Sequence, residues 1–230
     1  MPHRLLEGEH MDNPGEWKAH IPENLEELAR TNRWFGGTTS VRTPLRPLLP
    51  LKGARILDVG TADGATLAAL GRWAANRGAE WELHGLDLFP GFLELAGPTP
   101  GFTRCVGDAV ALPFPDRSFD AAVSLQTLHH FDDHGAVSVL RELTRVSRNL
   151  VVVSDLRRSL PTYAAARGLA TFFWRNAMTR HDGPRSVRAS FTPDELVNLG
   201  RRADPDEAWR VRAHGPFRIV LECARGEESL

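Results

Sequence analysis

Residues 56–67 combine the end of a strand, a glycine turn and the start of a helix: Ile-Leu-Asp-Val-Gly-Thr-Ala-Asp-Gly-Ala-Thr-Leu. The apolar run ends at Asp58, and the chain then turns through Gly60 and Gly64. Glycine suits a backbone that takes unusual dihedral angles or approaches a ligand closely. The helix N-terminus that follows offers free N–H groups to a charged, nucleotide-like ligand. This pattern predicts an α/β fold, but nicotinamide and flavin sites use similar turns, so the turn alone does not identify the ligand.

Three more signals follow at ordered spacings. Asp87 ends an apolar stretch about twenty residues after the turn, where a carboxylate can accept hydrogen bonds from both hydroxyls of a ribose. Gly107-Asp108-Ala109 ends a short strand over residues 102–106, and a strand over 118–124 opens into a polar loop with His129 and His130. Each acid alone is explained equally well as a helix cap, a turn cap or a solvated strand end. Four such features in one order are much harder to explain as independent accidents.

With these motifs the sequence resembles the class I S-adenosylmethionine-dependent methyltransferases, in the small-molecule branch with the quinone-methylase-like pattern. The resemblance is close over residues 51–156. It implies S-adenosylmethionine as cofactor and S-adenosylhomocysteine as product. In that family the first acid and the glycine turn hold the methionine moiety, the acid after the second strand binds ribose, and the Asp of Gly-Asp-Ala faces the adenine amino group. One departure is Ala62, which replaces the middle glycine of the turn and fits a turn with negative φ. The positions carried over as cofactor-binding are Asp58, Gly60, Thr61, Gly64, Asp87, Leu88, Asp108, Ala109 and Gln126.

Strand and helix patterns alternate through the middle of the chain, which predicts a parallel sheet with helices on both faces. The resemblance adds a Rossmann-like fold: a mostly parallel seven-stranded sheet with an antiparallel last strand, a helical N-terminal lid and a helical insertion after strand 5. We divide the chain into a lid over residues 1–50, containing a helix at 23–35 and a Pro-rich linker at 44–50, and a methyltransferase domain over 51–230. The insertion covers about 157–190, with a helix from Tyr163 to Met178 and a loop from His181 to Arg185. Residues 1–15 are expected to be poorly ordered.

Composition limits the partners. The net charge of −1 gives no general attraction for nucleic acid, and the loop after strand 4 lacks the Asn-Pro-Pro-Tyr type of sequence used by nucleic-acid amino methylases. With no long apolar run and no leader-like start, we expect a cytoplasmic protein without a membrane partner. Residues 141–190 hold ten arginines and three acids. That bias suits either a solvated helical face or a basic patch for an anionic substrate or an acidic carrier protein. The pattern does not predict an oligomeric state.

The acceptor is expected to be a small molecule, most simply a hydroxyl of an aromatic or polyketide-type compound. A protonated hydroxyl needs a base, and a histidine suits that role. His129, after strand 4 at the carboxyl edge of the sheet, and His181, in the insertion, are the candidates, with His214 a weaker third. Aromatic residues in the lid and insertion suit either the lining of an apolar acceptor pocket or the packing of helices against the sheet: Trp34, Phe35, Phe172, Phe173 and Trp174. No Cys/His cluster has zinc-ligand spacing, so no metal site is predicted.

Two other readings stay open. A nicotinamide-dependent oxidoreductase would explain the glycine turn and Asp87, but it leaves Asp108 and the loop after strand 4 without a role. A methyltransferase-like protein that binds the cofactor without transferring its methyl group would carry the same motifs.

Overall fold

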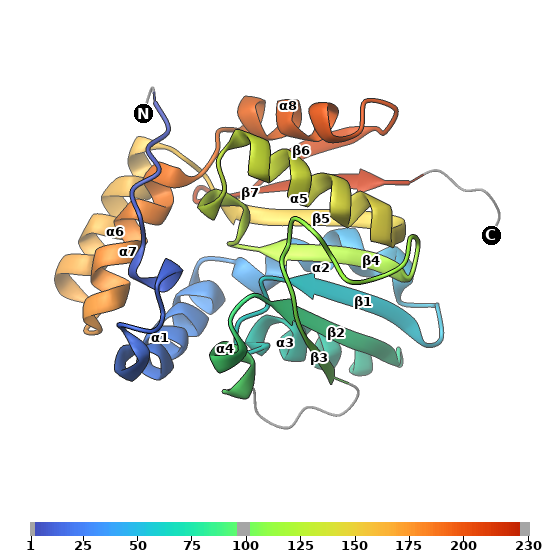
Figure 1. Ribbon diagram of the computed structural model, residues 1–230, viewed down its shortest axis with the longest axis horizontal. Coiled ribbons are helices and arrows are strands. Elements are labelled where there is room, and N and C mark those ends of the chain that lie inside the picture. The colour runs from blue at the N-terminus through green and yellow to red at the C-terminus, as the bar shows by residue number, and fades with distance from the viewer. Residues whose placement is uncertain (1–2, 96–101, 226–230) are drawn as a thin grey trace.

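One seven-stranded sheet organises the molecule in the computed structural model, which describes residues 3–95 and 102–225 (Figure 1). The strand order is β3-β2-β1-β4-β5-β7-β6. The first five strands run parallel, whereas β7 pairs antiparallel with both β5 and β6. The predicted sheet with its antiparallel final strand is therefore confirmed. The strands are β1 (Ala54–Val59), β2 (Trp81–Asp87), β3 (Phe102–Val106), β4 (Phe119–Leu125), β5 (Ser147–Leu156), β6 (Trp209–His214) and β7 (Arg218–Ala224).

Helices cover both faces of the sheet. On one face α5 and α8 bury Leu140 and Leu196 against Val151 of β5. On the other face α2 and α3 bury Val41 and Leu67 in the cluster that contains Val152. Neighbouring residues of β5 thus face opposite layers, as the alternation of a strand requires. The helices are α1 (Ile21–Trp34), α2 (Gly37–Leu45), α3 (Ala65–Ala75), α4 (Pro90–Glu94), α5 (Asp133–Val146), α6 (Leu160–Phe172), α7 (Ala177–Ala189) and α8 (Pro193–Ala203), with 3₁₀ turns η1 (His10–Asp12), η2 (Lys18–His20), η3 (Arg46–Leu48) and η4 (Leu128–His130).

The carboxyl edge of the parallel strands is covered by a cap made of α1, α6 and α7, which lie beside one another at the left of Figure 1. Ile21 and Leu25 of α1 pack with Phe92 of α4, and Met11 and Ala62 join this cluster. Ala62 belongs to the glycine turn. The N-terminal part of the chain therefore packs directly on the turn.

The insertion differs from the prediction. The predicted helix from Tyr163 to Met178 is interrupted, and the residues predicted as a loop, His181 to Arg185, lie inside α7. Asn176 explains the break, because its side chain accepts hydrogen bonds from the N–H groups of Met178 and Thr179 and so caps a new helix.

Two N-terminal predictions were also wrong. Gly37 begins a second helix, α2, and the predicted Pro-rich linker is the end of that helix followed by η3. Residues 4–12, which we call the N-terminal strap, are not loose: Arg4 donates to the carbonyl groups of His129, Phe131 and Ala189. Residues 1–2 lie outside the described part of the chain. Within the described part, no helix is both long and apolar enough to cross a membrane.

Candidate active site

The glycine turn between β1 and α3 depends on left-handed backbone. Gly60 and Gly64 have φ of 76° and 74°, and a Cβ on Gly60 would lie 2.2 Å from the Thr127 Oγ1 atom. Both glycines are therefore required by conformation and by space, since a Cβ on Gly64 would lie 2.8 Å from the Phe102 ring. Ala62 has φ of 49°, so the expectation that alanine sits here with negative φ was wrong. The turn holds alanine in a region that alanine seldom occupies.

Asp58, at the end of β1, is buried with one oxygen unsatisfied. Its Oδ2 accepts the Thr61 hydroxyl at 2.9 Å, while Oδ1 has no partner in the described part of the chain. Burial raises the pKa of this carboxyl to about 7, and the nearby charge of Asp87 adds to the rise. A buried acid with a free oxygen is suited to a ligand that brings a donor or a positive charge.

Asp87 ends β2 and faces the same turn. Its Oδ2 accepts the N–H of Ala62 at 2.8 Å and its Oδ1 the N–H of Phe89 at 3.0 Å. Burial raises its pKa, and these backbone bonds oppose the rise. Each carboxylate oxygen has a second lone pair for a ligand hydroxyl. Leu88 beside it is 53% exposed, an apolar surface next to this carboxylate.

The other cofactor candidates lie at neighbouring strand ends. Asp108 is exposed after β3 and accepts the N–H of Val110 at 3.0 Å, while Ala109 is buried. Gln126 follows β4 with φ of 52°, and its N–H donates to the Ser154 carbonyl at 2.9 Å. Parallel strands bring all these ends to one edge of the sheet. The structure thus gathers the predicted positions, with Asp108 the most open of the acids.

His129 lies in η4 between two carboxyl groups. Its Nδ1 is 2.7 Å from Asp155 Oδ1, and its backbone N–H donates to Asp155 Oδ2 at 3.1 Å. Its Nε2 faces Glu9 of the strap at 3.6 Å, longer than a hydrogen bond. The imidazole is only 2% exposed. Burial raises the pKa of Asp155, but the charge and hydrogen bond of His129 outweigh it and hold that pKa below its usual range.

Glu9 is fixed by its neighbours. It accepts the Ser186 hydroxyl at 2.8 Å, and burial raises its pKa to about 7 although the charge of His130 and the bond from Ser186 oppose the rise. The adjacent His130 contacts Asp12 of the strap at 2.8 Å. The strap therefore places one carboxyl group beside each histidine of the loop after β4.

His181 and His214 lie elsewhere. His181 Nδ1 is 2.6 Å from Asp182 Oδ1, and its ring stacks on His10 at 3.7 Å. Asp182 also accepts the N–H groups of His10 and Met11, so it anchors the strap. His214 contacts Thr39 near α2. Of the three candidates, only His129 follows a parallel strand of the sheet.

The aromatic lining suggested for an acceptor pocket is not formed. Trp34, Phe172 and Phe173 stand in solvent. Phe35 packs edge-on against Phe217, and Trp174 donates to the Thr31 hydroxyl at 3.1 Å.

Sequence reasoning missed Asp155 and Glu9. Asp155 ends a buried strand just as Asp58 and Asp87 do, so the same pattern was available as a signal. Glu9 reaches its place only through the packing of the strap, and no local pattern marks it.

An open α/β sheet with acids at successive strand ends around a glycine turn is the arrangement of Rossmann-like ligand-binding proteins. Residues 57–151 match a family model described as a methyltransferase domain. Demethylmenaquinone methyltransferase of Roseiflexus castenholzii is 32% identical over 77% of this chain and 79% of its own length, and that of Roseiflexus sp. strain RS-1 is 30% identical over 86% and 85%. The crystal structure of a SAM-dependent methyltransferase from Aquifex aeolicus shares the fold, with a TM-score of 0.61, 17% identity and coverage of 88% of this chain and 97% of that one.

The chain belongs to the class I S-adenosylmethionine-dependent methyltransferases, in their quinone-methylase-like branch. It is accordingly an enzyme that takes its methyl group from S-adenosylmethionine and acts on a small molecule. This membership decides against the oxidoreductase reading.

Proposed function

We propose that this enzyme methylates a hydroxyl group on a small aromatic ring of phenol or quinol type, with His129 as the base. The observation that carries the proposal is the pairing of His129 with Asp155 at the carboxyl edge of the sheet. The Roseiflexus relatives are named for methylating demethylmenaquinone, which supports an acceptor of the quinol class.

The cofactor site we propose fits the group it has to hold. The free Oδ1 of Asp58 suits the ammonium of the methionine part, since a buried carboxylate gains from a positive partner. Gly60, Thr61 and Gly64 shape the turn, and the carboxylate of Asp87 suits two ribose hydroxyls. When bound, S-adenosylmethionine supplies a methyl group activated by its attachment to a positive sulfur. The adenine ring of the cofactor would lie beside Leu88, Asp108, Ala109 and Gln126.

Asp155 gives His129 its role. By accepting the Nδ1 proton it keeps the neutral ring in the tautomer with a lone pair on Nε2. That Nε2 would take the acceptor's hydroxyl proton as the hydroxyl oxygen receives the methyl group that the bound cofactor would supply, with the cofactor's sulfur as the leaving group. The products are the methyl ether, S-adenosylhomocysteine and a protonated His129. Because Glu9 faces Nε2 at 3.6 Å, the strap has to shift for the acceptor oxygen to reach it.

The test compares His129→Ala with His181→Ala on a panel of phenols and quinols. We expect His129→Ala to lower kcat by about 10²–10⁴ with unchanged affinity for S-adenosylhomocysteine, and His181→Ala to lower it much less. A phenol acidic enough to be ionised already should restore turnover in His129→Ala, which a merely structural role would not allow. Product mass and NMR report whether a methyl group is transferred and to which atom. Full turnover in His129→Ala, or a methyl group on a ring carbon, contradicts the proposal.

A chelator provides the control. Donor atoms of Glu9, His129 and His130 lie within 4.8 Å of one another, close enough to share one cation. If His129 acts as a base, activity should survive extensive treatment with EDTA. The donor atoms of His10, His181 and Asp182 are equally close, so loss of activity that a divalent ion restores would give His129 the role of a ligand only if His129→Ala abolishes metal binding and His181→Ala does not.

A further inference from the structure

Three large aromatic side chains stand in solvent at one end of the cap. Trp34 is 71% exposed, Phe172 80% and Phe173 66%. Phe172 ends α6 and Phe173 begins the turn to α7, whereas Trp34 ends α1. The turn and α1 are joined by the hydrogen bond from Trp174 to Thr31, and Trp34 lies three residues after Thr31 on the same side of the helix. We call Trp34, Phe172 and Phe173 the aromatic tip.

Such a tip needs an explanation in physical terms. A single exposed apolar residue is ordinary, but neighbouring exposed rings mark a surface that meets another phase or molecule. The Trp174 ring shows the contrast: it fits against Gly183 so closely that a Cβ there would lie 2.4 Å from the ring. Of Phe172-Phe173-Trp174, the chain thus keeps only Trp174 partly buried and leaves the other two outside.

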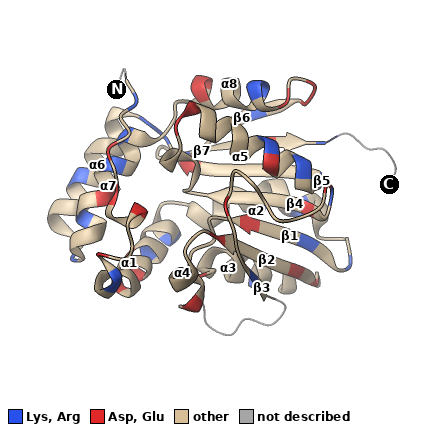
Figure 2. Cartoon of the chain, viewed as in Figure 1, with Lys and Arg blue, Asp and Glu red and all other residues tan. Residues whose placement is uncertain are grey.

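Exposed arginines outnumber exposed acids around the tip, although α1 also carries the exposed Glu23 and Glu26 (Figure 2). From Arg157 to Ala189 the chain carries seven arginines and a single acid, Asp182, which is buried and holds the strap. On α1, Glu27 is buried and accepts the N–H of Arg175, and Glu23 accepts from Asn176. The exposed arginines on α1, α6, the turn and α7 are Arg30, Arg33, Arg167, Arg175 and Arg180.

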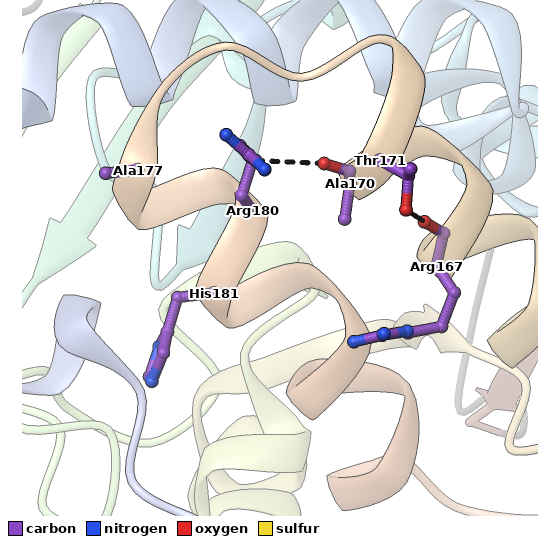
Figure 3. A pocket seen from close by; sticks show the side chains of 6 residues that line it. All are labelled: Arg167, Ala170, Thr171, Ala177, Arg180 and His181. Carbon is purple, nitrogen blue, oxygen red and sulfur yellow. Dashed lines mark hydrogen bonds between the residues drawn. The ribbon is translucent and has the colours of Figure 1, made fainter.

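A hollow of about 370 Å³ lies between α6 and α7, next to the tip (Figure 3). Arg180 and Arg167 flank it, and Arg180 Nε donates to the Ala170 carbonyl at 3.0 Å, which fixes that guanidinium. None of the described residues that line it is acidic. The two guanidinium groups lie on opposite sides of the hollow (Figure 3), and the Thr171 hydroxyl already donates to the Arg167 carbonyl, so a phosphate group here would be held by an arginine alone. The hollow is lined by Arg167, Ala170, Thr171, Ala177, Arg180 and His181.

We propose that the aromatic tip and the arginine hollow dock this enzyme on an anionic lipid bilayer. Aromatic rings favour the boundary between headgroups and acyl chains, and arginines favour an anionic leaflet. The hollow receives the phosphate of one lipid headgroup. The expectation of no membrane partner rested on the lack of a long apolar run, which tests for spanning helices and not for a surface of this kind.

The shape of the surface favours lipid over an acidic protein. The rings protrude from a helix end and do not line a groove, and the hollow beside them is lined mainly by polar side chains. A lipid surface accepts protruding rings without a complementary shape, whereas a protein partner needs a matching pocket for each ring. Few basic groups are involved, so docking is reversible and weakens with salt.

Docking through this surface would fix the position of the active site relative to the bilayer. The cap covers the carboxyl edge of the sheet, and the tip lies on the cap (Figure 1). A bilayer held there leaves the edge that carries His129 on the far side of the cap, next to Ala189 at the other end of α7, so an acceptor dissolved in lipid would have to pass the cap to reach it. This consequence rests on the proposed function, whereas the docking itself does not.

The test measures co-sedimentation with vesicles. We expect the full chain to bind vesicles that contain phosphatidylglycerol, to bind vesicles of phosphatidylcholine alone at least about tenfold more weakly, and to be released by high salt. Phe172→Ser/Phe173→Ser should lose about tenfold or more in affinity, Arg167→Gln/Arg180→Gln should lose the preference for anionic lipid, and Phe172→Trp/Phe173→Trp should keep binding. The matched control is Arg201→Gln/Arg202→Gln, two exposed arginines on α8, which should bind as the parent does.

Titration with S-adenosylhomocysteine shows that each variant is folded, independently of any acceptor. Failure of the parent to bind anionic vesicles overturns the proposal, as does equal binding by the Phe172→Ser/Phe173→Ser variant. A dimer in solution that this variant abolishes, or capture of an acidic protein without vesicle binding, would likewise assign the tip to a protein contact. Vesicle binding by an enzyme that methylates no phenol would uphold the docking and overturn only the proposed function.

Discussion

At the scale of single residues, the acids at strand ends differ in whether both of their carboxylate oxygens have hydrogen-bond partners. Asp87 is satisfied by two backbone N–H groups, whereas Asp58 keeps one buried oxygen without a partner. A free buried oxygen costs stability in the ligand-free protein and becomes useful when a donor arrives. We therefore expect Asp58 to contribute more to cofactor affinity than its burial beneath the turn suggests.

Asp58→Asn tests this expectation. The variant keeps the size of the side chain but removes the negative charge, and a charged hydrogen bond contributes about 1.5–3 kcal/mol. Affinity for S-adenosylhomocysteine should fall by about tenfold to a hundredfold in calorimetry. Asp63→Asn is the control, because Asp63 lies in the same turn but bonds to the N–H of Ala65. Equal losses of affinity in the two variants would contradict a specific role of Asp58 in binding the cofactor.

The residues also show what sequence can predict. The turn, Asp58 and Asp87 follow from a local rule, the acid at the end of a buried strand, and the same rule applied once more reaches Asp155. The prediction of a negative φ at Ala62 was wrong because residue type gives only a preference for φ, and the surrounding turn decides the value of that angle. Glu9 could not be predicted, since its contact with His129 spans 120 positions of the chain and depends on how the strap packs.

At the scale of elements, the strap is the piece that local patterns described worst. Scattered Gly, Pro and charged residues indicated disorder, yet Arg4 and Asp182 hold the strap by hydrogen bonds to backbone groups. In the insertion, Asn176 begins a new helix as its N-cap residue, and this outweighed the helical pattern that continued through Phe172 and Trp174. Both errors arose where one polar side chain redirected a segment.

Arg4→Ala should free the strap. Arg4 donates to carbonyl groups within η4, directly after η4 and at the end of α7, and its guanidinium lies 3.8 Å from the centre of the Phe191 ring. We expect residues before Ile21 to be cleaved about tenfold faster in limited proteolysis, because the segment opens more often once these bonds are lost. Arg46→Ala, at an exposed position of η3, is the control. Unchanged cleavage would show that the strap is held by other contacts.

At the scale of the whole molecule, the parallel sheet and its two helical layers were predictable from the alternation of strands and helices, and the spaced motifs indicated the family, which implied seven strands with an antiparallel last one. The packing of the cap over the edge of the sheet was not predictable from the sequence. It arises from contacts between α1, α7 and the strap, which lie far apart in sequence, and from an apolar cluster that joins α1 to the glycine turn.

The raised pKa values of two carboxyl groups predict how the stability of the protein depends on pH. Asp58 and Glu9 each have a pKa of about 7 in the folded protein, against about 4 when unfolded. The folded state therefore holds more protons between about pH 4 and pH 7, so the contribution of these groups to stability falls as pH rises through that range. Without cofactor, Asp58→Asn/Glu9→Gln should gain several °C in Tm relative to the parent at about pH 8 and little at about pH 5. A gain that does not depend on pH would contradict the assignment.

The place of β7 in the sheet determines when the fold can be completed during synthesis. This strand lies between β5 and β6 and pairs with β5 along its length. Until the ribosome has released Arg218–Ala224, the nascent chain presents β5 as an open edge rich in valine, which is prone to pair with other chains. The parallel half of the protein must therefore wait for its last strand, and chaperones that shield strand edges have their longest opportunity to act in that interval.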